Sequence, residues 1–535
     1  MDGIAYLDMA KVYLAHDWHS AINGYWSPLY SWLLALLMGV ITAKPESELL
    51  LARALNFAIF LVAILAFGLC WKTLGERNRA LSATMSSIAE IYPAGWTIFG
   101  YALFVMPAAW YIGALVPDMA VAAIVFASIA LLLRLEDGKE HPVSAYVAFG
   151  AVLGIGYYAK VILFYFAVFL LVTMGLRQMR GGKLLRPVAA GATFLIIISP
   201  FVFFLSTTLG HFTIGESGKL NYAWLADIPK TKNWLTGSPD AAALPFYPGP
   251  LLHDNPMVFK LPVLSGITYA PRYDPSRYDF QNHPRFEPGP QLRRIISNAR
   301  AFNEVVFSSE EALLLSLIIL VLYSPREFFR RLAKDWFWIL PIIAIVMMYV
   351  LVYLSWRYML AFIPLLWGAA LGSVTVPERL RTTVRPVMLA ALIVFGLHTV
   401  PGLLHYLARK ENGLRPEMGI AESLRSYGIR PGDLVATVGD GKDALWAHLA
   451  GVSVVAELWS ADVPAFVGSS SEEREAILQM MSDAGAKAVI WRSALSCPGP
   501  WLSLPRQGGC IFLPSGDNIR STQAIPQVSH DQHSR

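Results

Sequence analysis

Long apolar stretches follow one another along the first 405 residues of this chain of 535. Each runs for roughly 17 to 25 residues, the length that a helix needs to cross the hydrocarbon core of a bilayer. Charged residues make up only 15% of the chain, against roughly 25% in soluble domains. We therefore predict an α-helical polytopic membrane protein with about ten transmembrane helices. Their ranges are 48–71, 81–106, 117–135, 142–158, 160–176, 187–206, 308–323, 336–354, 358–375 and 386–404.

An eleventh apolar run, at 28–43, has only 16 residues and begins at Pro28. It is short for a crossing, so two interpretations stay open: a juxtamembrane helix in the interface, or a segment that enters the bilayer without crossing it. A full crossing would move the N-terminal segment to the other side and leave every later helix in place.

The distribution of basic residues indicates the orientation, since Lys and Arg in short loops stay on the cytoplasmic side. One set of alternating short loops holds sixteen Lys and Arg residues, whereas the short loops between them hold only Lys160 and Arg357. We therefore expect the N-terminal segment, the long loop 207–307 and the residues after 405 on the outer side.

The N-terminus carries no export signal of its own. Met1 is followed directly by Asp2, with no basic region and no apolar core of a signal peptide. We therefore expect the natural reading frame to begin upstream, with one more transmembrane helix that leads outward into Asp2.

Charge and cysteine content exclude further classes. The chain has 43 Lys and Arg residues against 38 Asp and Glu, a formal net charge of +5 that is spread in small groups. Nucleic-acid binding requires a concentrated basic patch, so we expect no nucleic-acid partner. Three cysteines cannot build a zinc cluster, although Cys497 and Cys510 could pair if their domain faces an oxidising compartment.

The loop 207–307 carries twelve of the 34 prolines together with many aromatic and polar residues. It is too long for a simple connector. Because proline interrupts helices, we expect an irregular cap without long helices. Its aromatic rings are available either to stack on a sugar or to lie among lipid headgroups, and both interpretations stay open.

After residue 412 the sequence alternates amphipathic helices with short apolar strands. The predicted helices are 418–427, 443–450 and 472–484, and the predicted strands are 433–438, 452–458 and 487–491. This order predicts a small extracytoplasmic α/β domain at 413–515 with a mainly parallel sheet, followed by a disordered tail at 516–535. The turn 439–441 lacks the full G-x-G-x-x-G spacing, so we expect no dinucleotide site there.

Ionisable residues near the outer ends of the apolar stretches need a physical reason, because charge at membrane depth is costly. Asp2 begins a helix-like stretch and shares one face with Tyr6 and Tyr13. Its carboxylate is either a helix N-cap or a functional group. Asp8 and Asp17 fall on other faces of the same segment, where we expect solvated positions.

Three more residues stand at outer helix ends. Asp118 follows Pro117 at a helix start, where a carboxylate gains from the helix dipole, so a structural and a catalytic role are both open. Lys160 lies in a turn between two helices, where simple extension toward the headgroups would explain it. Arg357, next to Tyr358, has a guanidinium suited to bidentate phosphate binding. Two carboxylates and two cations on one face indicate an anionic ligand, an acid–base step, or both.

Taken together, these motifs resemble the GT-C superfamily of polyprenyl-phosphate-sugar-dependent glycosyltransferases. The motifs are Asp2-Gly3-Ile4-Ala5-Tyr6, Tyr25-Trp26-Ser27-Pro28-Leu29-Tyr30 before an apolar helix, Pro117-Asp118, Lys160 and Arg357-Tyr358. The chain is similar to bacterial relatives of protein O-mannosyltransferases and of the lipid A aminoarabinose transferase. The resemblance covers about residues 1–405 and implies a GT-C-like catalytic bundle in the bacterial cytoplasmic (inner) membrane, with its active site on the outer side.

The resemblance also implies a chemistry. A polyprenyl-phosphate sugar would be the donor, and an envelope lipid, glycan or protein the acceptor, in an inverting single displacement. Asp2 would act as the general base, Arg357, Lys160 and Tyr358 would hold the donor phosphate, and Asp118 and Tyr6 would serve the acceptor or a metal ion. Many members carry a second acid after the first, where this chain has Gly3, so the resemblance leaves a divalent cation open and implies no other cofactor.

Two other functions fit the same residues. A transporter or flippase of a lipid-linked saccharide would grip the phosphate without breaking a bond. An assembly scaffold would use the C-terminal domain to bind envelope partners.

Overall fold

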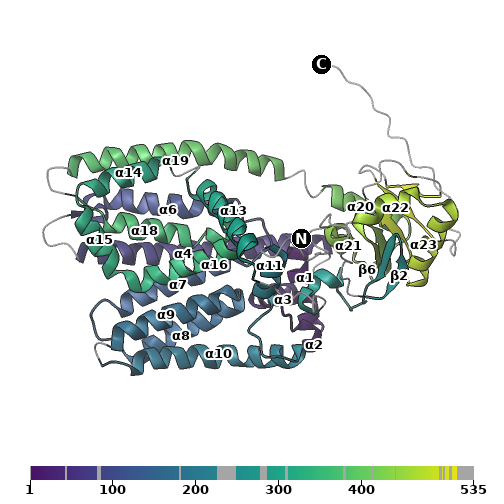
Figure 1. Cartoon of the computed structure of the whole chain (residues 1–535), viewed down its shortest axis with the longest axis horizontal. Coiled ribbons are helices and arrows are strands. Elements are labelled where there is room, and N and C mark those ends of the chain that lie inside the picture. Colours follow the sequence, from purple (N-terminus) through teal and green to yellow (C-terminus); the bar gives the residue numbers. More distant parts are fainter. Residues whose placement is uncertain are drawn as a thin grey trace, which may run out of the picture.

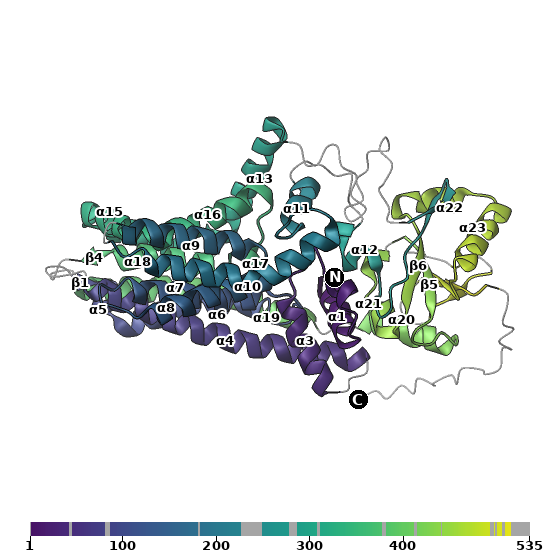
Figure 2. The ribbon, with the colours of Figure 1, turned by 90° about the horizontal axis from the view of Figure 1, so that it is seen from below.

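The computed structural model describes residues 2–41, 45–80, 86–179, 182–225, 249–277, 286–307, 311–376, 381–410, 415–439, 441–492, 497, 500–504 and 509–514. Figures 1 and 2 both show an elongated bundle of helices at one end and a unit of helices and strands at the other. The short N-terminal helices lie between these two parts in both views.

The bundle consists of long, mostly apolar helices that run side by side. Each of the ten predicted apolar ranges overlaps one of them. They are α4 (Pro45–Ala80), α6 (Pro93–Ala109), α7 (Asp118–Leu135), α8 (Val143–Ala159), α9 (Ile162–Met179), α10 (Leu185–Leu209), α14 (Glu311–Leu322), α16 (Trp336–Val352), α18 (Phe362–Ser373) and α19 (Arg381–Lys410). Helices are the expected solution in lipid, because each satisfies its backbone polar groups internally.

Within the described residues, five of these helices are long and apolar enough to cross a membrane, in α4, α7, α9, α10 and α19. A sixth span results if α15 (Pro325–Lys334) and α16, which are bent by 84° at their junction, are counted as one. Three further apolar helices, α8, α18 and α3 (Leu29–Val40), are shorter. The chain is therefore a multi-pass membrane protein, while the number of about ten crossings stays a prediction.

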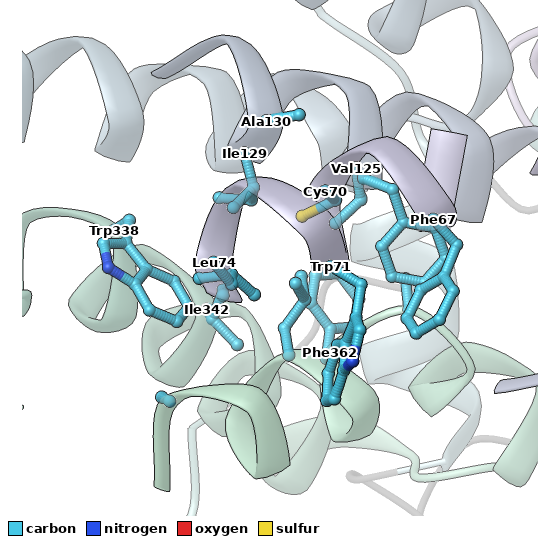
Figure 3. Packing of buried hydrophobic residues seen from close by; sticks show 14 of the residues in the cluster. Phe67, Cys70, Trp71, Leu74, Val125, Ile129, Ala130, Trp338, Ile342 and Phe362 are labelled. Atoms are coloured by element: carbon cyan, nitrogen blue, oxygen red, sulfur yellow. The ribbon is translucent and has the colours of Figure 1, made fainter. Parts of the chain in front are cut away.

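One face of α4 forms much of the bundle core. Figure 3 shows Phe67, Cys70, Trp71 and Leu74 of this face against residues of α7, α16 and α18. The Trp71 ring stacks on Trp96 of α6 with 4.5 Å between centroids. Gly100 of α6 permits this approach, because a Cβ at this position would lie 2.2 Å from Trp71 Cε2. Close helix contact at a small residue is the usual packing solution in membranes.

The N-terminal segment forms α1 (Asp2–Leu14), α2 (Trp18–Ala21) and α3. Tyr6 of α1 meets Tyr30 of α3 edge to face, with 5.3 Å between ring centroids. Most of α1 is buried, although it is not among the helices long enough to span a bilayer. It therefore fills the space between the bundle and the C-terminal unit.

Two sheets are present in the described residues. A two-stranded one pairs β1 (Ser86–Ser87) with β4 (Thr375–Val376). In the other, seven strands lie in the order β2-β3-β6-β5-β7-β9-β8. Their bounds are β2 (Leu251–Asp254), β3 (Met257–Lys260), β5 (Leu434–Val438), β6 (Ser453–Leu458), β7 (Val489–Trp491), β8 (Leu502–Ser503) and β9 (Cys510–Phe512).

The larger sheet differs from the predicted one. Its central strands β6, β5 and β7 are parallel, but every other pair is antiparallel. The three strands that the sequence predicted, β5, β6 and β7, pair in parallel as expected, but the strands that it did not predict pair antiparallel, so the sheet as a whole is not mainly parallel. The helices around it are α20 (Arg415–Ser426), α21 (Leu445–Ala450), α22 (Val463–Gly468) and α23 (Ser471–Asp483), with 3₁₀ turns η3 (Gly441–Asp443) and η4 (Ser460–Asp462). Cys497 and Cys510 form a disulfide, which the sequence had left open.

The loop 207–307 is more regular than predicted. It contains α11 (Ser217–Leu225), strands β2 and β3, α12 (Ala270–Tyr273), the turn η1 (Pro275–Arg277) and α13 (Pro288–Phe307). The 20-residue α13 contradicts the expectation that its prolines exclude long helices. Pro288 and Pro290 lie in the first turn of α13, where no intrahelical N–H bond is lost.

Remaining short elements are α5 (Ile88–Ile91) and α17 (Trp356–Met359). The predicted tail at 516–535 lies outside the described residues.

Candidate active site

Asp2 is the first residue of α1. Its two carboxylate oxygens accept hydrogen bonds from two guanidiniums. Arg357 Nη2 lies 2.8 Å from Asp2 Oδ2, and Arg272 Nη2 lies 2.7 Å from Asp2 Oδ1. The carboxylate is therefore held by side chains from distant parts of the chain, which a helix N-cap alone would not require.

Arg357 belongs to the short helix α17, which follows the extended residues 353–355 at the end of α16. The guanidinium contacts both predicted carboxylates, since Arg357 Nε also lies 3.7 Å from Asp118 Oδ2. Asp118 and Asp2 are thus bridged by one cation.

Asp118 opens α7 directly after Pro117, so its charge lies at the favourable end of the helix dipole. Lys160 ends α8 in an extended conformation, and this turn directs its side chain toward α7. Lys160 Nζ lies 2.7 Å from Asp118 Oδ1. The lysine therefore points to a buried carboxylate instead of extending toward lipid headgroups.

Tyr358 completes the cationic side of the cluster. Lys160 Nζ lies 3.8 Å from the centroid of its ring, within the range of a cation–π contact. Its hydroxyl accepts a hydrogen bond from Arg357 Nη2 at 3.1 Å. Tyr349 stacks on the same ring, with 5.0 Å between centroids.

Tyr6 lies one turn after Asp2 and is only 3% exposed. Its ring packs edge to face on Trp26 and Tyr30. Burial raises the pKa of its hydroxyl well above the usual value, and the nearby Asp2 carboxylate raises it further. Tyr6 therefore stays neutral and shapes the wall of the site.

Two cavities meet at the Asp2–Arg357 pair. The smaller, of about 70 Å³, is lined by Tyr6, Asp118, Lys160, Arg357 and Tyr358 as well as Asp2. The larger, of about 540 Å³, has Asp2 and Arg357 on one side and Glu417, Asp443 and Arg492 of the C-terminal unit on the other. The larger volume lies within the usual range for ligand pockets.

The charges of the cluster change the ionisation of Asp2. Burial by itself would raise the pKa of this carboxyl. The positive charges of Arg357 and Arg272 outweigh burial and lower the pKa to about 2. For Arg357 burial works against the charged form, but Asp118 and Asp2 raise its pKa above the ordinary value. Both groups are therefore charged at neutral pH.

Sequence reasoning did not single out Arg272 as a site residue. It lies in α12, inside the proline-rich loop, where no apolar pattern marks a side chain that reaches the membrane surface. Its contact with Asp2 spans 270 positions in the sequence. The local sequence carried no signal for this pairing.

The expectation for Asp8 was wrong. We expected a solvated position, but Asp8 is 1% exposed and lies against Thr268 and His448. Helical periodicity correctly placed Asp8 on a different face of α1 from Asp2. That other face is also covered by protein, so Asp8 is buried. Asp17 is exposed, and its side chain caps α2.

The described residues hold no group of three or more His, Cys, Asp and Glu side chains arranged for a metal ion. Asp2 and Asp118 have cationic partners instead.

No family model and no curated protein matches the chain. Solved structures do. The chain is similar to ArnT from Cupriavidus metallidurans in the apo state, with 13% identity and a TM-score of 0.40 over 95% of this chain and 92% of that chain. The structure of the same protein bound to undecaprenyl phosphate matches with 14% identity and a TM-score of 0.41 over the same shares.

An oligosaccharyltransferase from Archaeoglobus fulgidus, in complex with Zn and sulfate, matches with 14% identity and a TM-score of 0.49. The match covers 92% of this chain and 64% of that chain. Both proteins are GT-C glycosyltransferases. This is the superfamily that the sequence motifs resemble.

Proposed function

We propose that this protein is an integral membrane glycosyltransferase. It moves a sugar from a polyprenyl-phosphate donor to an acceptor hydroxyl at the outer face of the bacterial cytoplasmic membrane. The observation that carries the proposal is the meeting of Asp2, Asp118, Lys160 and Arg357 where two cavities join. Buried charges are costly, so a cluster of this kind at a membrane surface favours a site for an ionic substrate.

The cationic side of the cluster suits the donor phosphate. Arg357 offers a planar guanidinium with several donors, and Lys160 adds a second positive charge beside it. Both line the smaller cavity with Tyr358. Cations in this position stabilise the negative charge that the phosphate oxygen gains as the bond to the sugar breaks.

The larger cavity suits the acceptor and the sugar. It begins at Asp2 and continues to the C-terminal unit. In a single displacement the acceptor oxygen forms its bond to the anomeric carbon on the side opposite the departing phosphate. The electron pair of the broken bond stays on the phosphate, and Asp2 accepts the proton of the acceptor hydroxyl.

Donor binding also prepares the base. A carboxylate with a pKa of about 2 is a weak base, because Arg357 and Arg272 stabilise its charge. A phosphate that binds Arg357 competes with Asp2 for the same guanidinium. Once Asp2 shares Arg357 with the phosphate, this cation lowers the pKa of Asp2 less. The pKa then rises because burial favours the protonated form, and the carboxylate becomes a better base.

The deciding experiment uses the purified protein in proteoliposomes with a labelled polyprenyl-phosphate sugar and a membrane extract as the source of acceptor. Asp2→Asn keeps the shape of the side chain and removes the base. We expect transfer to fall by about 10²- to 10⁴-fold, while donor binding is retained. Asp17→Asn, which changes an exposed carboxylate of the same segment, is the matched control and keeps full activity.

The outcomes separate the candidate functions. Release of free lipid phosphate that depends on the acceptor and on Asp2 supports the transferase. Movement of intact donor across the bilayer without cleavage would instead identify a flippase. Full transfer by Asp2→Asn would remove this carboxylate from the mechanism.

A further inference from the structure

A second buried polar cluster lies behind the candidate active site. His448 of α21 is 1% exposed and contacts a carboxylate with each ring nitrogen. Its Nδ1 lies 3.2 Å from Asp8 Oδ1 of α1, and its Nε2 lies 3.1 Å from Glu48 Oε2 of α4. One side chain of the C-terminal unit thus connects an N-terminal helix and a helix of the bundle.

Two more residues complete this cluster. Lys11 Nζ of α1 lies 2.9 Å from the same Glu48 oxygen. Thr268 donates its backbone N–H to Asp8 Oδ2 at 2.8 Å and its hydroxyl to Asp8 Oδ1 at 3.0 Å. Asp8 and Glu48 are 1% and 5% exposed. The cluster is therefore shielded from competing water.

The partners determine the protonation of His448. Asp8 Oδ1 can only accept a hydrogen bond, so Nδ1 should carry a proton, and the Glu48 carboxylate 3.1 Å from Nε2 favours a positive charge on the ring. Burial opposes this charge, but the two carboxylates prevail and raise the pKa of His448. The two positive charges of His448 and Lys11 then balance the two negative charges of Asp8 and Glu48.

The cluster is linked to Asp2 through two parallel connections. Asp8 contacts Thr268, and Asp2 contacts Arg272. Helix α1 is therefore joined at two points to one segment of the loop 207–307. The segment of Thr268 is itself bonded to the C-terminal sheet, because Val454 of β6 donates its N–H to Thr268 O at 2.9 Å. A shift of Asp8 would therefore move the helix that carries Asp2.

We propose that His448, as an imidazolium held between Asp8 and Glu48, is a positioning residue that couples the C-terminal unit to α1 and fixes the Asp2 carboxylate in the site. The catalytic part of this inference rests on the proposed function. The structural part, that His448 restrains α1, does not. A cavity of about 610 Å³ beside the cluster is lined by Lys11, Thr268 and His448.

The kinetic test compares His448→Gln with wild type. We expect kcat to fall about 10-fold or more, since small displacements of a catalytic group are costly. The Kd for the donor should stay within about 2-fold of wild type, because His448 lines neither cavity of the active site. The wild-type kcat should also decrease as alkaline pH removes the proton of His448, and this decrease should be absent from the variant. Unchanged kcat, or the same alkaline decrease in both proteins, overturns the proposal.

Two further variants keep the test decisive. Asp8→Asn removes the partner carboxylate, and the double variant Asp8→Asn/His448→Gln should lose less kcat than the sum of the two single losses, because either single variant already breaks the contact between Asp8 and His448. Losses that simply add contradict the coupling. If His448→Gln unfolds, Asp8→Asn carries the same comparison. His211→Gln, which changes an exposed histidine that pairs with Glu216, is the matched control and should behave as wild type.

Hydrogen exchange separates this inference from the proposed function. Backbone amides of residues 4–14 should exchange faster in His448→Gln than in wild type, since the helix loses an anchor. If wild type transfers no sugar but the exchange increases, the proposed function fails and the restraint on α1 stands. Unchanged exchange overturns the restraint whatever the activity.

Discussion

Arg357 Nη2 lies 2.8 Å from Asp2 Oδ2, although the two residues are 355 positions apart in the sequence. This ion pair joins the start of α1 to α17, which follows most of the bundle helices in the sequence. It also lies where the two cavities of the candidate site meet. Under the proposed function this contact joins the base to the phosphate-binding cation, so Arg357 influences how readily Asp2 accepts a proton.

Substitution of Arg357 should separate charge from geometry. We expect Arg357→Gln to lower transfer by about 10²- to 10³-fold, the loss typical of a missing oxyanion donor. Arg357→Lys should recover only part of this loss, because an ammonium keeps the charge but not the planar set of donors. Transfer and donor binding are measured in proteoliposomes. Arg300→Gln, on the exposed face of α13, should be unaffected. Equal activity of Arg357→Gln and Arg300→Gln would contradict the assignment.

The pH dependence should reveal the exchange of Arg357 between Asp2 and the donor. Asp2 must be ionised to act as a base, so activity is lost as pH falls through its pKa. In the free protein this pKa is about 2, so kcat/KM should show no decrease from Asp2 in the mildly acidic range. The acid limb of kcat should lie at higher pH, because the bound phosphate shares Arg357. Coincident acid limbs in kcat and kcat/KM would argue against this exchange.

Arg272 should affect chemistry more than donor binding. It contacts Asp2 but lines neither cavity of the site. Arg272→Gln removes one of the two cations that lower the pKa of Asp2, so the acid limb of kcat/KM should move to higher pH. We expect a lower kcat, because the Asp2 carboxylate also loses one of the two contacts that hold it in place, and an unchanged Kd for the donor. A loss of donor binding equal to that of Arg357→Gln would instead place Arg272 at the phosphate.

The bundle core allows a test of packing that is independent of function. Gly100→Ala adds a methyl group where Trp71 Cε2 would be 2.2 Å away, so the stacked Trp71 and Trp96 rings must shift. Overpacking of this kind costs about 1–3 kcal/mol. Gly191→Ala on α10 is the control, because a Cβ there meets nothing within 4 Å. Thermal unfolding in detergent should show a lower midpoint for Gly100→Ala alone, and equal midpoints would refute the packing argument.

Sequence reasoning succeeded where the signal is local. Apolar runs located the bundle helices, since a bilayer demands continuous apolar surface. Asp2, Asp118, Lys160 and Arg357 stood out because an ionisable group at a helix end near the membrane needs a partner. The structure brings all four to one place.

The errors have a common physical cause. Asp8 was expected in solvent because helical periodicity describes one helix and not what packs on its other faces. The sheet was expected to be mainly parallel, but β3 from the proline-rich loop pairs antiparallel with β6. Arg272 and His448 gave no signal, because each acquires its role from a residue that is 270 or 440 positions away.

The sequence by itself determined that the chain lies in a membrane, where its helices run and which ionisable groups need an explanation. These properties follow from the free-energy cost of exposing backbone and charge to lipid. That cost depends on each residue and its neighbours in the sequence, so a local pattern reveals it. Only the tertiary structure decided which charges neutralise each other. The energy of an ion pair depends on the distance between its two charges, and no local pattern encodes that distance.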